Sequence, residues 1–144
     1  MKGTFVGVIL LAAATFVARA DMRVKLTAHV GTSYTYTVSF DPGDIVGNNS
    51  CTIWSVAIPG FLGQTHPPNW LLGGSLTGSS DRATIPTLSF TYLGPQLGPT
   101  TILPITGFQF FSTYSGLDET GVYTSHTCTP WQGSHRGMLT VPIN

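Results

Sequence analysis

Large apolar side chains alternate with hydroxyl side chains most clearly in the segment SYTYTVSF, residues 33–40. Tyr34, Tyr36 and Val38 occupy every second position, and serine or threonine fills the positions between them. Because successive side chains of a β-strand point to opposite faces, this pattern predicts a strand that buries an aromatic face and turns a hydroxyl face to water. The sequence DPGD at 41–44 then ends the strand with residues that favour a turn.

Apolar or alternating runs of strand length recur along the chain, and glycine or proline bounds most of them. They lie at 24–30, 51–58, 70–72, 75–77, 88–92, 108–114, 122–127 and 138–141. No segment after residue 20 repeats its apolar residues with the period of a helix. Seven to nine short strands with turns between them predict an all-β fold, a single antiparallel β-sandwich. The proline-rich stretches 59–69 and 94–104 are expected to be loops along the edges of the sandwich.

The N-terminal region has a different pattern, which is typical of a secretory signal peptide. Lys2 precedes an uncharged, mainly apolar run at 5–17, and the tripeptide ARA at 18–20 has the small side chains that signal peptidase requires. This run is shorter than the roughly 20 apolar residues that span a bilayer as a helix. We expect a helical signal peptide at 1–20 and a mature domain at 21–144 without a membrane span. The alternatives are a buried N-terminal helix or an uncleaved anchor.

The expected export decides the chemical state of the two cysteines. In an oxidising compartment Cys51 and Cys128 form the one possible intramolecular disulfide. The bridge would close a loop of about 77 residues, for which the chain-entropy argument gives roughly 4.5 kcal/mol. The alternative is a metal site in which His126 and His135 join the cysteines, although neither cysteine belongs to a CxxC pair. We expect the disulfide and no bound metal.

Composition narrows the possible functions. Only 8% of the residues are charged, with six Lys and Arg against six Asp and Glu, whereas 33 residues are serine or threonine. Removal of the expected leader takes away Lys2 and Arg19, which leaves four basic against six acidic side chains. Because such a chain cannot neutralise a run of phosphates, nucleic-acid binding is excluded.

Several segments together resemble exported bacterial β-rich proteins of the PEP-CTERM type, which exosortase machinery sorts. The similar stretches are YTYTV and PGD at 34–38 and 42–44, TI at 52–53, PPNW at 67–70, ATIPTLSFTYLGP at 83–95, the aromatic run near 108–112 and GVYTS at 121–125. The resemblance implies secretion or surface display and identifies no catalytic residue. The chain departs from that family at 140–144, where TVPIN stands in place of the sorting signal. This departure is expected either from a freely released protein or from a truncated sequence.

Candidates for catalysis are few. Most acidic residues stand beside or near glycine, proline or serine, where aspartate commonly caps a turn: Asp41, Asp44, Asp81 and Asp118, which lies two residues after Gly116. A glycosidase pair of Asp81 with Glu119 is a lesser alternative. A Ca²⁺ site formed by Asp41, Asp44 and carbonyls of 47–50 is another alternative, but the turn interpretation is favoured. There is no GxSxG motif, and the four histidines are expected at the surface or in loops.

The aromatic side chains are the one feature that suggests a ligand. Trp54 alternates with Ile53 and Ser55 and is expected in the core. Trp70 follows PPN and Trp131 follows Pro130, so both adjoin loops, where an exposed indole can stack on the apolar face of a sugar ring. Trp70 and Trp131 are therefore the candidate carbohydrate-binding residues.

Taken together, the residues predict a non-enzymatic, secreted or surface-associated bacterial protein without a cofactor. Its expected role is that of a structural component associated with the extracellular matrix or exopolysaccharide, and its possible partners are polysaccharide or sister surface proteins. The first alternative is a carbohydrate-binding module that uses exposed Trp or Tyr. The second is an enzyme similar to glycoside hydrolases.

Overall fold

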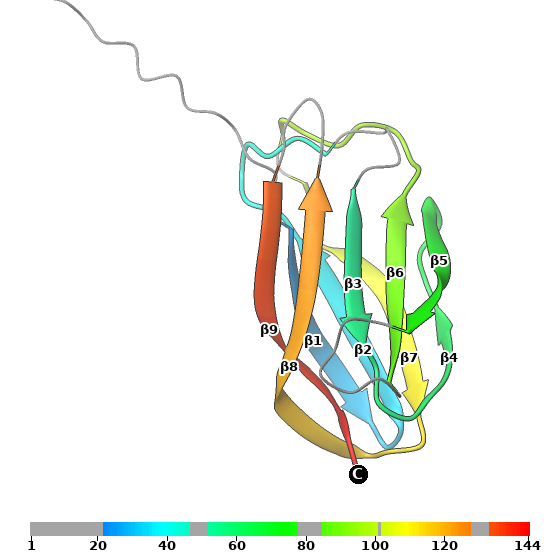
Figure 1. The fold of residues 1–144 in the computed structure, drawn as a ribbon. Coiled ribbons are helices and arrows are strands. Elements are labelled where there is room, and N and C mark those ends of the chain that lie inside the picture. Colours follow the sequence, from blue (N-terminus) through cyan, green and yellow to red (C-terminus); the bar gives the residue numbers. More distant parts are fainter. Residues whose placement is uncertain (1–21, 47–51, 78–84, 101, 128–132) are drawn as a thin grey trace, which may run out of the picture.

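Two antiparallel sheets lie face to face in the computed structural model, which describes residues 22–46, 52–77, 85–100, 102–127 and 133–144 (Figure 1). The four-stranded sheet has the order β1-β2-β7-β4. Its strands are β1 (Arg23–Val30), β2 (Ser33–Ser39), β7 (Ile105–Ser112) and β4 (Phe61–Thr65). The five-stranded sheet has the order β5-β6-β3-β8-β9. Its strands are β5 (Trp70–Thr77), β6 (Pro86–Tyr92), β3 (Ile53–Ala57), β8 (Gly116–Thr127) and β9 (Gly133–Ile143).

The predicted all-β class is confirmed for this part of the chain. The described residues contain no helix, and therefore none that is long and apolar enough to cross a membrane. The expected signal peptide at 1–20 lies outside the described residues.

An aromatic cluster joins the two sheets. Trp54 on β3 is fully buried, as its alternation predicted, and its ring stacks on Phe90 of β6 at 5.0 Å between centroids. The same indole meets Phe108 of β7, in the opposite sheet, edge to face at 5.1 Å. Alternation in β2 is confirmed as well, since Tyr34 and Tyr36 are fully buried between half-buried serine and threonine side chains. Such ring pairs contribute beyond the area that they bury.

Two predictions about the edges of the sheets were wrong. The stretch 59–69 is not a continuous loop, because it contains β4, which pairs with β7. Its burial does not alternate strictly and the pairing shifts register between Phe61 and Gly63, so the strand leaves no period-two signal. The runs at 70–72 and 75–77 are one strand, β5, in which the register shifts between Gly73 and Leu76. The expected loop at 94–104 has no strand among its described residues.

Tyrosine hydroxyls tie the four-stranded sheet to the five-stranded one. Tyr34 Oη donates to the carbonyl oxygen of Gly116 at 2.7 Å, and Tyr36 Oη donates to that of Thr140 at 2.8 Å. Desolvation by burial raises the pKa of both phenols, and for Tyr36 the neighbouring Tyr34 adds to the effect. The buried hydroxyls are thus held in the neutral, donating form.

Because of these hydroxyls, the free energy of unfolding depends on pH in the alkaline range. The folded pKa of Tyr36 lies above the unfolded value of about 10, so the unfolded chain releases its proton first. The stabilisation that the neutral Tyr36 hydroxyl provides is complete below pH ~10 and is lost as the pH rises above that value. We expect Tyr36→Phe to cost about 1 kcal/mol at pH 7 through the lost hydrogen bond. The same variant should lose less stability than the wild type above pH ~10. Urea unfolding at both pH values checks this, and equal alkaline losses in the two proteins would contradict it.

Cys51 and Cys128 lie outside the described residues, so their disulfide remains a prediction. Their chain neighbours Thr52 and Thr127 are both buried. In the antiparallel ladder of β3 and β8, Ile53 pairs with His126, so Thr52 and Thr127 adjoin the last described pair of that ladder.

Mass spectrometry of the exported protein tests the leader and the bridge together. We expect a chain that begins at Asp21 and is lighter than its reduced form by two hydrogens. Replacing both cysteines with alanine should lower the free energy of unfolding by about 2–4 kcal/mol. Free thiols in the freshly exported protein would contradict the bridge, and a mass that includes residues 1–20 would contradict cleavage.

Candidate functional site

Each described aspartate makes a local hydrogen bond or ion pair. Asp41 pairs with Arg23 at 2.8 Å, and Asp44 accepts a hydrogen bond from the backbone N–H of Asp41 at 2.7 Å. Asp118 accepts from the N–H and the hydroxyl of Thr120, at 2.8 and 2.6 Å. The contact of Asp44 agrees with its predicted turn role, whereas Asp41 forms an ion pair and Asp118 lies within strand β8. No catalytic partner for them follows from the geometry.

The acidic groups also lie at opposite ends of the two sheets. Tyr34, at the start of β2, bonds to Gly116, at the start of β8. Asp41 follows the far end of β2, which at the rise of a strand is about 20 Å away from the end that holds Asp118. A glycosidase needs carboxyl groups roughly 5–10 Å apart, so these two do not form such a pair. Asp81, the proposed partner of Glu119, lies outside the described residues.

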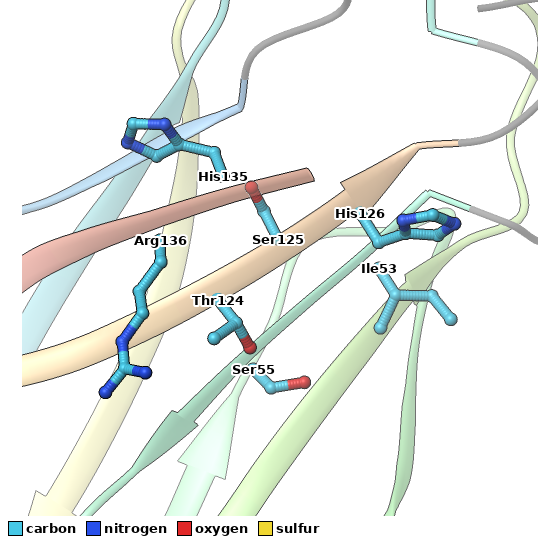
Figure 2. Close-up of a pocket in the computed structure, with 7 residues that line it drawn as sticks. All are labelled: Ile53, Ser55, Thr124, Ser125, His126, His135 and Arg136. Atoms are coloured by element: carbon cyan, nitrogen blue, oxygen red, sulfur yellow. The ribbon is translucent and has the colours of Figure 1, made fainter. Parts of the chain in front are cut away.

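The two histidines proposed as alternative metal ligands point to different faces of the five-stranded sheet. His135 pairs with Ser125, whose side chain is buried on the inner face. His126 is the next residue on β8 and therefore points outward. Figure 2 shows the two imidazoles directed away from each other. Among the residues that the structure describes, no three His, Cys, Asp or Glu side chains come together as metal ligands. The proposed metal ligands Cys51 and Cys128 are not among these residues.

A shallow trough crosses the outer face of the five-stranded sheet. One hollow of about 420 Å³ involves Ile53, Ser55, Thr124, Ser125, His126, His135 and Arg136 (Figure 2). A second, of about 140 Å³, shares Ser55, Thr124 and Arg136 with it and extends over β6. We call the two together the outer trough. Arg136 is the residue with a formal charge among those that line the outer trough. Short hydroxyl side chains supply most of the other polar groups.

Strand register explains why the trough is flat and polar. Ser89, Ser55, Thr124 and Arg136 are successive partners on β6, β3, β8 and β9, so they form one row across the sheet. The Oγ atoms of Ser55 and Ser89 are 2.8 Å apart and share a hydrogen bond. The inner face of the same strands holds Trp54 and Phe90, and alternation leaves the small hydroxyl residues outside.

A second, open pocket lies beside β5 and β6, at the opposite edge of the sheet from β9. Its volume is about 540 Å³, and we call it the edge pocket. Aromatic and aliphatic side chains form most of the wall: Trp70, Tyr92, Pro68, Leu97, Ile102, Leu103 and Ile105. The polar lining comes from Asn69, Gln96 and Thr100, and no residue that lines the pocket is charged.

Backbone contacts fix the loop that forms one wall of the edge pocket. Val46 and Leu97 exchange backbone hydrogen bonds of 2.9 and 3.1 Å. The N–H of Leu93 donates to the carbonyl oxygen of Asn69 at 2.7 Å, and Tyr92 Oη donates to that of Pro95 at 2.6 Å. Burial raises the pKa of Tyr92 and so favours this neutral donor. The wall is therefore formed before any ligand arrives.

The sequence led to one residue of this pocket and missed the others. Trp70 lines it, but its side chain is only 4% exposed and its ring packs on Phe108. Burial counts against an open stacking platform on Trp70, although its carbohydrate role remains a prediction. Trp131 lies outside the described residues. Asn69, Gln96 and Leu103 were not singled out, because loop residues have no periodic signal and the neighbour of Trp70 in sequence was the one available hint.

Comparison with protein families, with curated proteins and with solved structures finds no match for this chain. Its function therefore has to be argued from the outer trough and the edge pocket themselves.

The edge pocket depends on Gly98, which has a φ of +82°. A Cβ at this position would overlap the carbonyl oxygen of Asp44. We expect Gly98→Ala to cost about 1–3 kcal/mol of unfolding free energy, because the loop must move away from its support. Gly43→Ala is the matched control, since Gly43 has a φ of +90° and open space around it. Equal losses in urea unfolding would show that the contact with Asp44 does not hold the loop.

Proposed function

We propose that this chain is an exported, non-catalytic β-sandwich that associates with neutral extracellular polysaccharide through the outer trough. The observation that carries the proposal is the row of hydroxyl side chains across β6, β3 and β8, with Ser55 at its centre. A flat face of this kind offers many weak hydrogen bonds to a hydroxylated polymer. The resemblance to PEP-CTERM proteins, with its implied secretion or surface display, supports the same role.

Low charge is the second support. The outer trough contains one formal charge, that of Arg136, so association with a neutral polymer requires little removal of water from ions. Sister copies of the mature chain would also repel one another weakly, since it carries only four basic against six acidic side chains. Packing within a matrix is compatible with both properties. Polysaccharide is the partner that the hydroxyl row favours, in which Thr124 is exposed and Ser55 and Ser89 are half-buried.

The alternative, a carbohydrate-binding module that uses Trp70 and Trp131, is favoured by a different observation. Trp70 and Tyr92 meet in the wall of the edge pocket, 5.2 Å apart between ring centroids. In this version a single sugar unit, rather than a polymer surface, is recognised. The proposal of a glycoside hydrolase has no comparable support, because the described carboxylates make turn and ion-pair contacts.

Co-sedimentation with insoluble neutral polysaccharides tests the proposed function. We expect the fraction of mature protein that binds to change little between about 0.05 and 0.5 M salt, because few charges take part. Thr124→Lys places a long cation beside Arg136 in the trough and should lower the bound fraction by about tenfold or less.

Thr65→Lys is the matched control, because Thr65 is also an exposed strand threonine but lies on β4 in the other sheet. It should bind like the wild type. Equal binding by both variants would place the contact outside the trough. A steep fall of binding with salt would contradict the neutral mode of association.

A further inference from the structure

The edge pocket differs from the outer trough in the chemistry of its lining, which is mainly apolar and carries no charge. Its volume of about 540 Å³ falls within the range of small-molecule sites, which bury most of the ligand that they bind. The main hollow of the outer trough has a comparable volume of about 420 Å³, but Arg136 brings a charge to its lining. The difference in lining indicates that the edge pocket suits an uncharged group with an apolar face.

The wall of the pocket favours a neutral ligand. Asn69 and Gln96 carry amides that both donate and accept, and Thr100 carries a hydroxyl. Since no lining residue is charged, an ionised ligand would lose hydration without gaining an ionic partner. A group with several hydroxyls and no charge can instead exchange its hydrogen bonds with water for bonds to the two amides.

The apolar part of the wall favours a ligand that also has an apolar face. Trp70 and Tyr92 meet at an interplanar angle of 54°, but their side chains are only 4% and 3% exposed, so they support the pocket from behind. Leu103, at the rim, is 78% exposed and supplies the uncovered apolar side chain of the lining. A ring that carries hydroxyls around its edge and C–H groups on its face matches both kinds of lining.

The backbone around the pocket is already in place for such a ligand. Asn69 has a φ of +67°, a left-handed conformation in the turn that brings its side chain to the pocket. A Cβ on Gly94 would come within 2.8 Å of the Cβ of Asn69 and would overlap the Tyr92 hydroxyl. Glycine at 94 therefore permits the close approach of Asn69 and Tyr92. Binding a ligand would then cost little conformational entropy in the loop, which favours affinity.

We propose that the edge pocket binds one neutral sugar unit, at the end or on a side branch of a polysaccharide. This inference rests on the proposed function and assigns it a second, specific contact. The trough would hold the polymer loosely, and the pocket would select the unit. Gln96 and Asn69 are the expected hydrogen-bonding residues, and Leu103 covers the face of the ring.

Ligand-observed NMR and calorimetry on the mature protein test this inference with defined probes. The probes are neutral hexoses, N-acetylhexosamines, their trisaccharides and the matching hexuronic acids. We expect at least one neutral sugar to bind and its uronic acid to bind more weakly. Leu103→Asp should weaken the binding about tenfold or more, because a carboxylate would be desolvated at the rim. Gln96→Ala should weaken it several-fold, about what a single hydrogen bond contributes.

Leu62→Asp is the matched control, because Leu62 is a 66% exposed leucine on β4 that does not line the pocket. It should bind like the wild type. If no neutral sugar binds while polysaccharide still sediments the protein, the pocket inference fails and the proposed function stands. If sedimentation fails too, both fail. Binding that survives Leu103→Asp and Gln96→Ala, or that favours uronic acids, would overturn the pocket as the site.

Discussion

The contact of the Trp54 indole with rings of both sheets is the interaction on which the rest of the structure depends. Trp54 stacks on Phe90 in its own sheet and meets Phe108 and Phe110 of the opposite sheet edge to face. The indole is fully buried, although its Nε1 has no hydrogen-bond partner within the described structure. The packing of the Trp54 ring therefore outweighs the cost of leaving its Nε1 donor without a hydrogen bond. Because the period of a strand is two, burying these rings decides which side chains on every neighbouring strand face water.

The outer trough and the edge pocket follow from that constraint. The hydroxyl row through Ser55 is the outer counterpart of the strand positions that bury Trp54 and Phe90. At the edge of the sheet, Trp70 continues the cluster through its contact with Phe108, and its other neighbours form the wall of the pocket. A single aromatic core thus supports a flat polar face and a pocket with an aromatic wall. With few charges available, both surfaces are suited to neutral partners.

The sequence predicted the elements that local periodicity determines. The inward face of β2, the burial of Trp54 and the turn role of Asp44 follow from alternation and turn chemistry within a few residues. Strand β4 was missed because an edge strand with shifted register has no alternating pattern. The edge pocket was missed for a different reason. It depends on contacts between Val46 and Leu97 and between Asn69 and Leu93, which are distant in sequence and which no periodicity encodes.

Indole fluorescence tests the aromatic core most directly. Trp54 and Trp70 are 0% and 4% exposed, and Trp131 is the remaining tryptophan of the chain. In the Trp131→Phe variant the emission therefore reports on the two buried rings alone. The account predicts blue-shifted emission and weak quenching by iodide or acrylamide in the folded protein, with both effects lost in urea. Red-shifted emission that quenchers reach as readily in the folded as in the unfolded chain would contradict it.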